Sequence, residues 1–180
     1  MTRTARRALA ILVALIATGL VAAPTSAQEK HKFSFTTPPG ASVYTQQHEI
    51  EVGDIPGHKI RIYETRAKYT GEAPSYAGTK VVEYWTRATS DYTDGSGRAS
   101  GYGVAVLENG DKIFSRYDVL THTVVESDGS RRTSVATVAT LTGGTGKFST
   151  IRGTLRSAGG TDFTRGTTGS KTEGEYWFEK

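Results

Sequence analysis

The sequence predicts an all-β protein, a single eight-stranded antiparallel β-barrel preceded by a cleavable signal peptide. Thr, Val, Tyr, Ile and Gly recur along the chain, and no segment after the N-terminus has the apolar periodicity of an amphipathic helix. Strand-like runs follow one another at fairly regular spacing, separated by turn residues. Every break is a turn and none is a linker, so one β-domain is expected.

The first 27 residues have the pattern of an export signal. Three arginines precede an apolar run from Ala8 to Leu15, and small residues continue through Ala23. The break at Pro24 and the small residues after it are what signal peptidase requires, so cleavage after Ala27 is expected. The product is then secreted or periplasmic. A retained membrane anchor is the alternative, although the run is short for a spanning helix of about 20 strongly apolar residues.

The charge balance argues against nucleic-acid binding. The chain has 22 Lys and Arg against 18 Asp and Glu, and loss of the three signal arginines leaves 19 against 18, a net charge of +1. Backbone binding to nucleic acid needs a dense basic patch. The chain has no cysteine, which excludes disulfides, thiolate metal sites and a lipid-modified cysteine as anchor.

The part after residue 27 divides into a lead and the barrel domain. Residues 28–42 contain Pro38-Pro39-Gly40 and are expected to form a flexible N-terminal lead, and residues 43–180 are expected to form the barrel. The eight strand-like runs are Val43–Val52, Lys59–Tyr69, Thr79–Ser90, Ala99–Glu108, Lys112–Val125, Arg132–Thr142, Lys147–Ser157 and Thr172–Glu179.

Turn sequences join several of these runs. Asn109-Gly110 predicts a type I′ hairpin, because both residue types tolerate positive φ. Asp128-Gly129 predicts a second hairpin, so three consecutive strands form a meander. The stretches 53–57, 94–97 and 158–160 mark further turns. A meander of this kind is most stable when the sheet closes and removes its edges, and a two-sheet sandwich is the competing architecture.

A glycine-rich stretch carries a family resemblance. Residues 141–148 read Leu-Thr-Gly-Gly-Thr-Gly-Lys-Phe, and Ile-Arg-Gly follows at 151–153. This resembles the Gly-Gly-Thr-Gly-x-Phe signature near the end of allene oxide cyclase and dirigent-type proteins, over about the last 40 residues. The resemblance implies an eight-stranded barrel with a central cavity. The run lacks P-loop spacing and a following helix, so a bulge or tight turn is the expected role of its glycines.

Cofactor chemistry finds no support in the sequence. His31, His48, His58 and His122 are scattered and form none of the pairs that preform a metal site. No Gly-x-Ser-x-Gly nucleophile elbow is present. We therefore expect neither a metal nor a cofactor.

Alternation within the strands gives candidate ligand-binding residues. One face of each of three strands mixes charged and apolar side chains, and Glu64, Glu83, Trp85 and Arg116 lie on these faces. If the faces point inward, Arg116 would hold an oxygen-bearing end of an apolar ligand and Trp85 would pack against it. The alternative is an outer face with ordinary cross-strand ion pairs. In either case both faces carry apolar side chains, so the outer one must be covered by the segment Phe33–Tyr44 or by a second subunit. A homo-oligomer is therefore one of the two expected arrangements.

Two function classes fit these expectations. The first is an exported protein that binds a small, hydrophobic or amphipathic molecule in its cavity. The second is a cofactor-free cyclase or isomerase of the allene oxide cyclase or dirigent type. A carboxylate with a raised pKa beside the ligand would indicate such an enzyme, and Glu83 is the candidate for it. A structural or interaction protein is a third class. Binding ranks first because no acid–base pair stands out.

Overall fold

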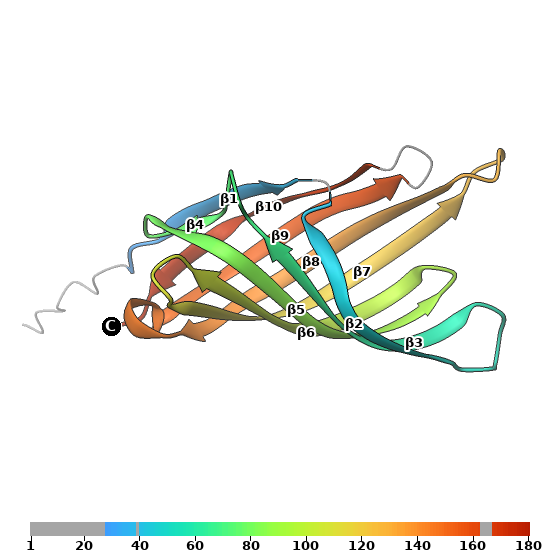
Figure 1. Ribbon diagram of the computed structural model, residues 1–180, viewed down its shortest axis with the longest axis horizontal. Helices are drawn as coiled ribbons and strands as arrows, with labels where there is room; N and C mark the ends of the chain where they lie inside the picture. Colours follow the sequence, from blue (N-terminus) through green and yellow to red (C-terminus); the bar gives the residue numbers. More distant parts are fainter. Residues whose placement is uncertain (1–27, 39, 163–166) are drawn as a thin grey trace, which may run out of the picture.

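The structure is a computed structural model that describes residues 28–38, 40–162 and 167–180 (Figure 1). The strands are β1 (His31–Thr37), β2 (Ser42–Glu51), β3 (His58–Lys68), β4 (Ser75–Tyr76), β5 (Thr79–Thr93), β6 (Ser96–Leu107), β7 (Lys112–Val125), β8 (Arg131–Gly144), β9 (Ile151–Asp162) and β10 (Thr167–Phe178), and the 3-10 helix η1 (Gly146–Phe148) lies between β8 and β9. The all-β, antiparallel prediction is confirmed. Within the described ranges no helix is long and apolar enough to cross a membrane. The expected signal peptide, residues 1–27, lies outside the described residues.

All ten strands belong to one sheet, and the sheet is open. The neighbour order is β1-β10-β9-β8-β7-β6-β5-β3-β2, with the short β4 paired to the start of β5. This is the order of a meander barrel opened at one seam, because the described parts of β1 and β2 do not pair although they follow each other in the chain. The predicted closed barrel of eight strands is therefore wrong in closure and in strand number. Among the described residues β2 pairs along its length with β3 alone, so its other edge has no strand partner.

The expected N-terminal lead is in part a strand of the sheet. Residues His31–Thr37 pair with β10 over seven positions, from His31 opposite Tyr176 to Thr37 opposite Ser170. The side chain of Phe33 is buried and stacks on Tyr76 with ring centres 4.8 Å apart. The sequence did not predict this strand, because its short alternating run lies next to Pro38-Pro39-Gly40 and was included in the flexible lead.

The predicted hairpins are present, but with a different distribution of turn types. At Asn109-Gly110 only Gly110 has positive φ, and its N–H donates to the carbonyl of Leu107 at 2.9 Å, so the turn is not type I′. Asp94 and Gly95 both have positive φ, at 50° and 81°, and join β5 to β6 as a two-residue type I′ hairpin. The meander is thus confirmed, whereas the type I′ turn predicted at Asn109-Gly110 is wrong.

The glycine-rich stretch has the structural role expected of it. The β7–β8 register shifts between Phe114 and Ser115, where Gly143, with φ 139°, forms a bulge. The chain then makes the η1 turn and places Phe148 in the core with no exposed surface. The core cluster gathers at this end of the sheet and comprises Phe33, Tyr76, Val81, Ala105, Leu107, Ile113, Leu141, Phe148, Ile151, Leu155 and Tyr176.

The sheet curls toward the face that carries this core. The inward positions of β6 include Gly101 and Gly103, and a Cβ on Gly101 would collide with the carbonyl oxygen of Arg87. The missing side chain lets β6 bend closely against β5, as glycine does at tight bends in sheets. In Figure 1 the strands lie close together near the end that holds η1 and diverge toward the opposite end. The curl produces a concave face and a convex face, which the two sets of alternating residues line.

Candidate ligand cavity on the concave face

The concave face holds a cavity of about 660 Å³. Side chains from every strand contribute to its lining, because the inward residues of nine strands and of the short β4 converge on the same space. A cavity of this size is within the range that small-molecule sites in proteins have. The residues that line it differ in chemical character from one end to the other.

The closed end of the cavity is apolar. Phe33, Tyr76, Val81, Ile113 and Leu141 are all buried there and belong to the core cluster. Phe148 of η1 is fully buried in the same core cluster, so these residues form a well-packed floor at the closed end of the cavity. This end suits the hydrocarbon part of a ligand.

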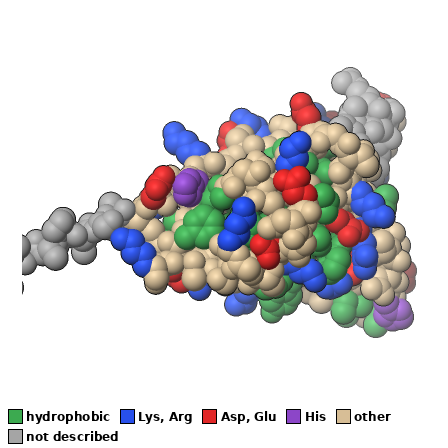
Figure 2. All heavy atoms as spheres, turned by 60° about the vertical axis from the view of Figure 1, so that its left-hand side comes forward, with side chains coloured by type: hydrophobic (Ala, Val, Ile, Leu, Met, Phe, Trp, Pro, Cys, Tyr) green, Lys and Arg blue, Asp and Glu red, His purple; other side chains and the backbone are tan. Residues whose placement is uncertain are grey.

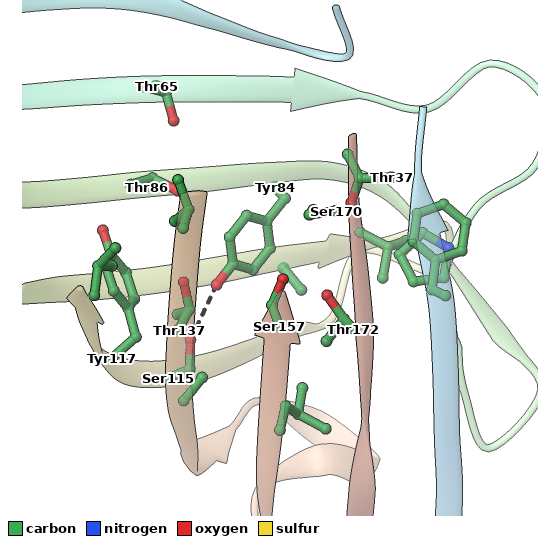
Figure 3. Close-up of a pocket in the computed structure, with 18 of the residues that line it drawn as sticks. Thr37, Thr65, Tyr84, Thr86, Ser115, Tyr117, Thr137, Ser157, Ser170 and Thr172 are labelled. Atoms are coloured by element: carbon green, nitrogen blue, oxygen red, sulfur yellow. Dashed lines mark hydrogen bonds between the residues drawn. The ribbon is translucent and has the colours of Figure 1, made fainter. Parts of the chain in front are cut away.

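The middle of the cavity is a band of hydroxyl groups (Figure 3). Its members are Thr37, Thr65, Tyr84, Thr86, Ser115, Tyr117, Thr137, Ser157, Ser170 and Thr172. Figure 3 shows them reaching into one space from strands on several sides of the cavity. The Tyr84 hydroxyl lies 3.2 Å from the Ser115 hydroxyl and forms a hydrogen bond with it. Hydroxyls both donate and accept, so this band can pair with several oxygen atoms of a ligand.

Two tyrosines in this band are strongly desolvated. Burial raises the pKa of Tyr117 far above the usual value for tyrosine, and it also raises the pKa of Tyr84. The Tyr117 hydroxyl is buried and makes no hydrogen bond of good geometry with the described residues, although the Thr86 side chain beside it offsets part of the rise in its pKa. A buried donor without a partner is costly, so a ligand oxygen at this position would be favourable.

Arg61 lies at the opposite end from the core and is the one charged residue among the described residues that line the cavity. Its guanidinium carbon is 5.0 Å from the ring centre of Tyr44 and 4.9 Å from that of Tyr63, which is cation–π geometry. Burial raises the pKa of Tyr63 to about 12, so its ring remains neutral. The Nε of Arg61 is buried without a hydrogen bond in the described part of the chain, and one terminal nitrogen donates to Gln47 at 3.3 Å.

The four residues predicted from alternation lie on the convex face. Glu64, Glu83, Trp85 and Arg116 are absent from the described lining of the cavity, and their inward neighbours Thr65, Tyr84, Thr86 and Ser115 line it instead. The inward orientation on which the site hypothesis depended is therefore wrong, and the alternative of an outer face with cross-strand ion pairs describes these positions. Figure 2 shows one view of the surface, where side chains of both charges are interspersed with hydrophobic ones.

Glu64 is the centre of the ion pairs on the convex face. Its side chain is only 5% exposed and accepts hydrogen bonds of 2.8 Å from the Nε atoms of Arg66 and Arg87. Together with a hydrogen bond from Thr45, these contacts lower the pKa of Glu64 to about 2. A carboxylate this acidic remains charged at neutral pH and is a structural counter-ion for the two arginines.

The other three predicted residues belong to the same outer surface. The ring of Trp85 lies under the guanidinium groups of Arg66 and Arg87, at 5.0 and 5.1 Å. Glu83 is 3.8 Å from Arg66, and Arg116 lies 6.0 Å from the ring of Tyr102. The structure thus brings Glu64, Glu83 and Trp85 together through Arg66, whereas Arg116 makes no contact with Arg66 and shares with Glu64 only the lining of a hollow on this face.

A second hollow, of about 670 Å³, lies over β2, β3, β5, β6 and β7 and includes Glu64 and Arg116 in its lining. Its apolar members Ile62 and Tyr102 are each 61% exposed. A ligand there would leave much of its own surface in water. The hollow on the convex face is for this reason a weaker candidate than the cavity on the concave face.

The residue types in the sequence indicated which face is concave, although the alternation of side chains alone did not distinguish the two faces. The set opposite Glu83 and Trp85 holds Tyr84, Thr86 and Ala88, a combination of aromatic, hydroxyl and small residues without charge. Inner faces exclude unpaired charges and tolerate hydroxyls that find partners. Arg61 escaped notice because it alternates with Ile60 and Ile62, which look like core residues and are 44% and 61% exposed.

Metal and acid–base groups are absent from the described lining. No group of three His, Asp or Glu side chains capable of holding a metal occurs among the described residues. No carboxylate or histidine lines the described part of the cavity. The groups that remain for chemistry there are hydroxyls and one guanidinium, which bind and orient rather than transfer protons near neutral pH.

Comparison with known proteins does not assign the chain to a family. No family model matches it, and neither a curated protein nor a solved structure is similar to it.

Proposed function

We propose that the protein binds a small, amphipathic molecule in the cavity on its concave face. The observation that carries this proposal is the graded lining of the cavity: an apolar floor, a band of hydroxyls and one cation lie in sequence along a space of about 660 Å³. Such a combination of apolar wall and a few placed polar groups is typical of ligand sites. A protein interior of this size without a ligand function is ordinarily filled by its own side chains.

Binding without conversion is favoured over cyclase or isomerase activity. The sign of catalysis would be a carboxylate of raised pKa beside the ligand space. Glu64 has a pKa lowered to about 2 and lies on the convex face, and Glu83 lies there too. The resemblance of residues 141–148 to allene oxide cyclase and dirigent-type proteins supports a cavity fold, since Phe148 closes its floor, but it contributes no reacting group.

The proposed place of action is outside the cytoplasm. Support comes from the N-terminal sequence alone, with its arginines, its apolar run and the small residues before Gln28. N-terminal sequencing of the protein isolated from its own host should find Gln28 or a close neighbour first. A chain that retains Met1 or Thr2 would contradict this part of the proposal.

A pair of variants on one strand tests the cavity proposal. Thr137 on β8 points into the cavity, and Thr140 on the same strand is exposed on the other face. Native mass spectrometry of the protein from its own host should show a small molecule bound to the wild type and to Thr140→Phe. Thr137→Phe, which fills the cavity, should be free of it. Equal occupancy of Thr137→Phe, or a wild-type protein that carries no ligand and binds none from a host extract, would contradict the proposal.

A further inference from the structure

We infer that the ligand is a monoanion that carries several oxygen atoms along its length, and that Arg61 holds its acidic group. The inference rests on the proposed function and deepens it. It commits to a ligand class, a hydroxylated polycyclic or chain-like acid, and to one residue of the chain as the anion-binding group.

Arg61 has the properties of an anion-binding residue. Its cross-strand neighbour Glu49 binds the Nζ of Lys59 at 2.7 Å and feels the Arg61 charge only at longer range, and Arg61 forms no ion pair within 4.0 Å in the described part of the chain. The rings of Tyr44 and Tyr63 hold the guanidinium in place, and one terminal nitrogen donates only a long hydrogen bond, of 3.3 Å, to the exposed Gln47. A fixed guanidinium with unused donors matches a carboxylate or another oxyanion, and a charge-assisted hydrogen bond is stronger than a neutral one.

The band of hydroxyls defines the rest of the ligand. Tyr84 and Ser115 already bond to each other, but a plain hydrocarbon chain would offer nothing to the hydroxyls of the band that have spare donors or acceptors. A ligand with hydroxyl or carbonyl groups between its apolar end and its acidic end satisfies them. The distribution of polar groups therefore disfavours a simple alkyl acid and favours an oxygenated one.

The convex face supplies a matched control. Arg116 is also an arginine beside a tyrosine, at 6.0 Å from the ring of Tyr102, but it lies outside the cavity. Substitution of Arg116 changes the net charge of the protein as much as substitution of Arg61 does. Any difference between the two variants then reflects position and not total charge.

The test uses cholate, which has ring hydroxyls and one carboxylate, together with its uncharged methyl ester and with 5β-cholanate, which keeps the carboxylate and lacks the hydroxyls. Isothermal titration calorimetry below micelle-forming concentrations compares wild type, Arg61→Gln, Arg61→Lys and Arg116→Gln. We expect cholate to bind the wild type about tenfold more tightly than either comparison compound. Arg61→Gln should abolish the preference for cholate over the ester, Arg61→Lys should keep part of it, and Arg116→Gln should keep all of it.

The outcomes separate the inference from the proposed function. If cholate and its ester bind with equal affinity and Arg61→Gln changes neither, the inference fails while cavity binding stands. If 5β-cholanate binds as tightly as cholate, the oxygenated class is wrong. If none of the three compounds binds, the inference fails, while the proposed function is decided separately by native mass spectrometry of the wild type and Thr137→Phe. Thermal unfolding of Arg61→Gln and Arg61→Lys near the wild-type temperature shows that the affinities compare folded proteins.

Discussion

Glu64 and Arg87 lie on neighbouring strands, and the Nε of Arg87 donates a hydrogen bond of 2.8 Å to the Glu64 carboxylate. Arg66 donates a second bond of the same length to the other carboxylate oxygen. The buried carboxylate thus links β3 to β5 on the convex face, close to the seam where the sheet is open. Its protonation state bears directly on the stability of that edge.

We predict that Glu64 makes folding stability depend on acidity. Its pKa is lowered from 4.5 to about 2 in the folded protein, so its contribution is fully present above pH 4.5 and is lost as the pH falls toward 2. Urea unfolding at a series of pH values should show Glu64→Gln less stable than wild type at pH 7, with the difference shrinking between pH 4.5 and 2. Glu72→Gln, at an exposed loop position, is the control. A difference that stays constant over this range would contradict the assignment.

We predict that Phe148 anchors the floor of the cavity. The residue is fully buried at the end of η1 and lies 6.1 Å from the ring of Phe178. Phe148→Ala should lower the free energy of unfolding by about 3–5 kcal/mol, because it removes a large buried side chain and leaves a void. Lys147→Ala, one residue away, should change the stability little. Equal effects of the two variants in urea unfolding would show that the glycine-rich stretch does not place Phe148 in the core.

We predict that Gly103 leaves space for the Tyr84 hydroxyl. A Cβ at position 103 would collide with that hydroxyl and with the Ser115 hydroxyl that bonds to it. Gly103→Ala should therefore destabilise the protein by about 1–3 kcal/mol through overpacking. The penalty should be smaller in a Tyr84→Phe background, which lacks the colliding oxygen. A double-mutant cycle measures this coupling, and a coupling of zero would contradict the contact.

We predict a second pH dependence, of opposite sign, at the β2–β3 turn. The two ring nitrogens of His58 lie 2.7 Å from Asp54 and 2.8 Å from Asp91, and these hydrogen bonds raise the pKa of His58 above 6.5. The stabilisation is fully present below pH 6.5 and is lost as the pH rises through the raised pKa. NMR titration should show His58 titrating above pH 6.5. His58→Gln should remove the loss of stability on the alkaline side, and an unchanged pH profile would contradict this account.

The sequence predicts the strands well because alternation and turn residues are local signals. The runs at Lys59–Tyr69 and Lys112–Val125 agree with β3 and β7 to within one residue. Closure of the sheet is not a local property, since it depends on whether β1 and β2 pair with each other at the two edges of the sheet. β1 pairs with β10, and Lys30 and Glu175 beside this pairing are 145 positions apart in the sequence. A local pattern near residue 31 does not indicate so distant a partner.

The alternation of side chains divided each strand correctly into two faces, but the face predicted to line the cavity was the convex one. Alternation grouped Glu83 with Trp85 and Tyr84 with Thr86 correctly, because successive strand residues point to opposite sides. It does not say which side is concave. The deciding feature was charge: Glu83 pairs with Arg66 and Arg116 is exposed on the convex face, whereas unpaired charges are costly inside a cavity.

The measurement that tests the central claim most directly is fluorine NMR of the protein with 3-fluorotyrosine in place of tyrosine. Tyr84 and Tyr117 line the cavity, and Tyr102 lies on the convex face as an internal control. Single Tyr→Phe variants assign the three signals. Addition of cholate should shift the signals of Tyr84 and Tyr117 and leave that of Tyr102 in place. Saturable binding that shifts Tyr102 alone, with Tyr84 and Tyr117 unmoved, would contradict a ligand site on the concave face.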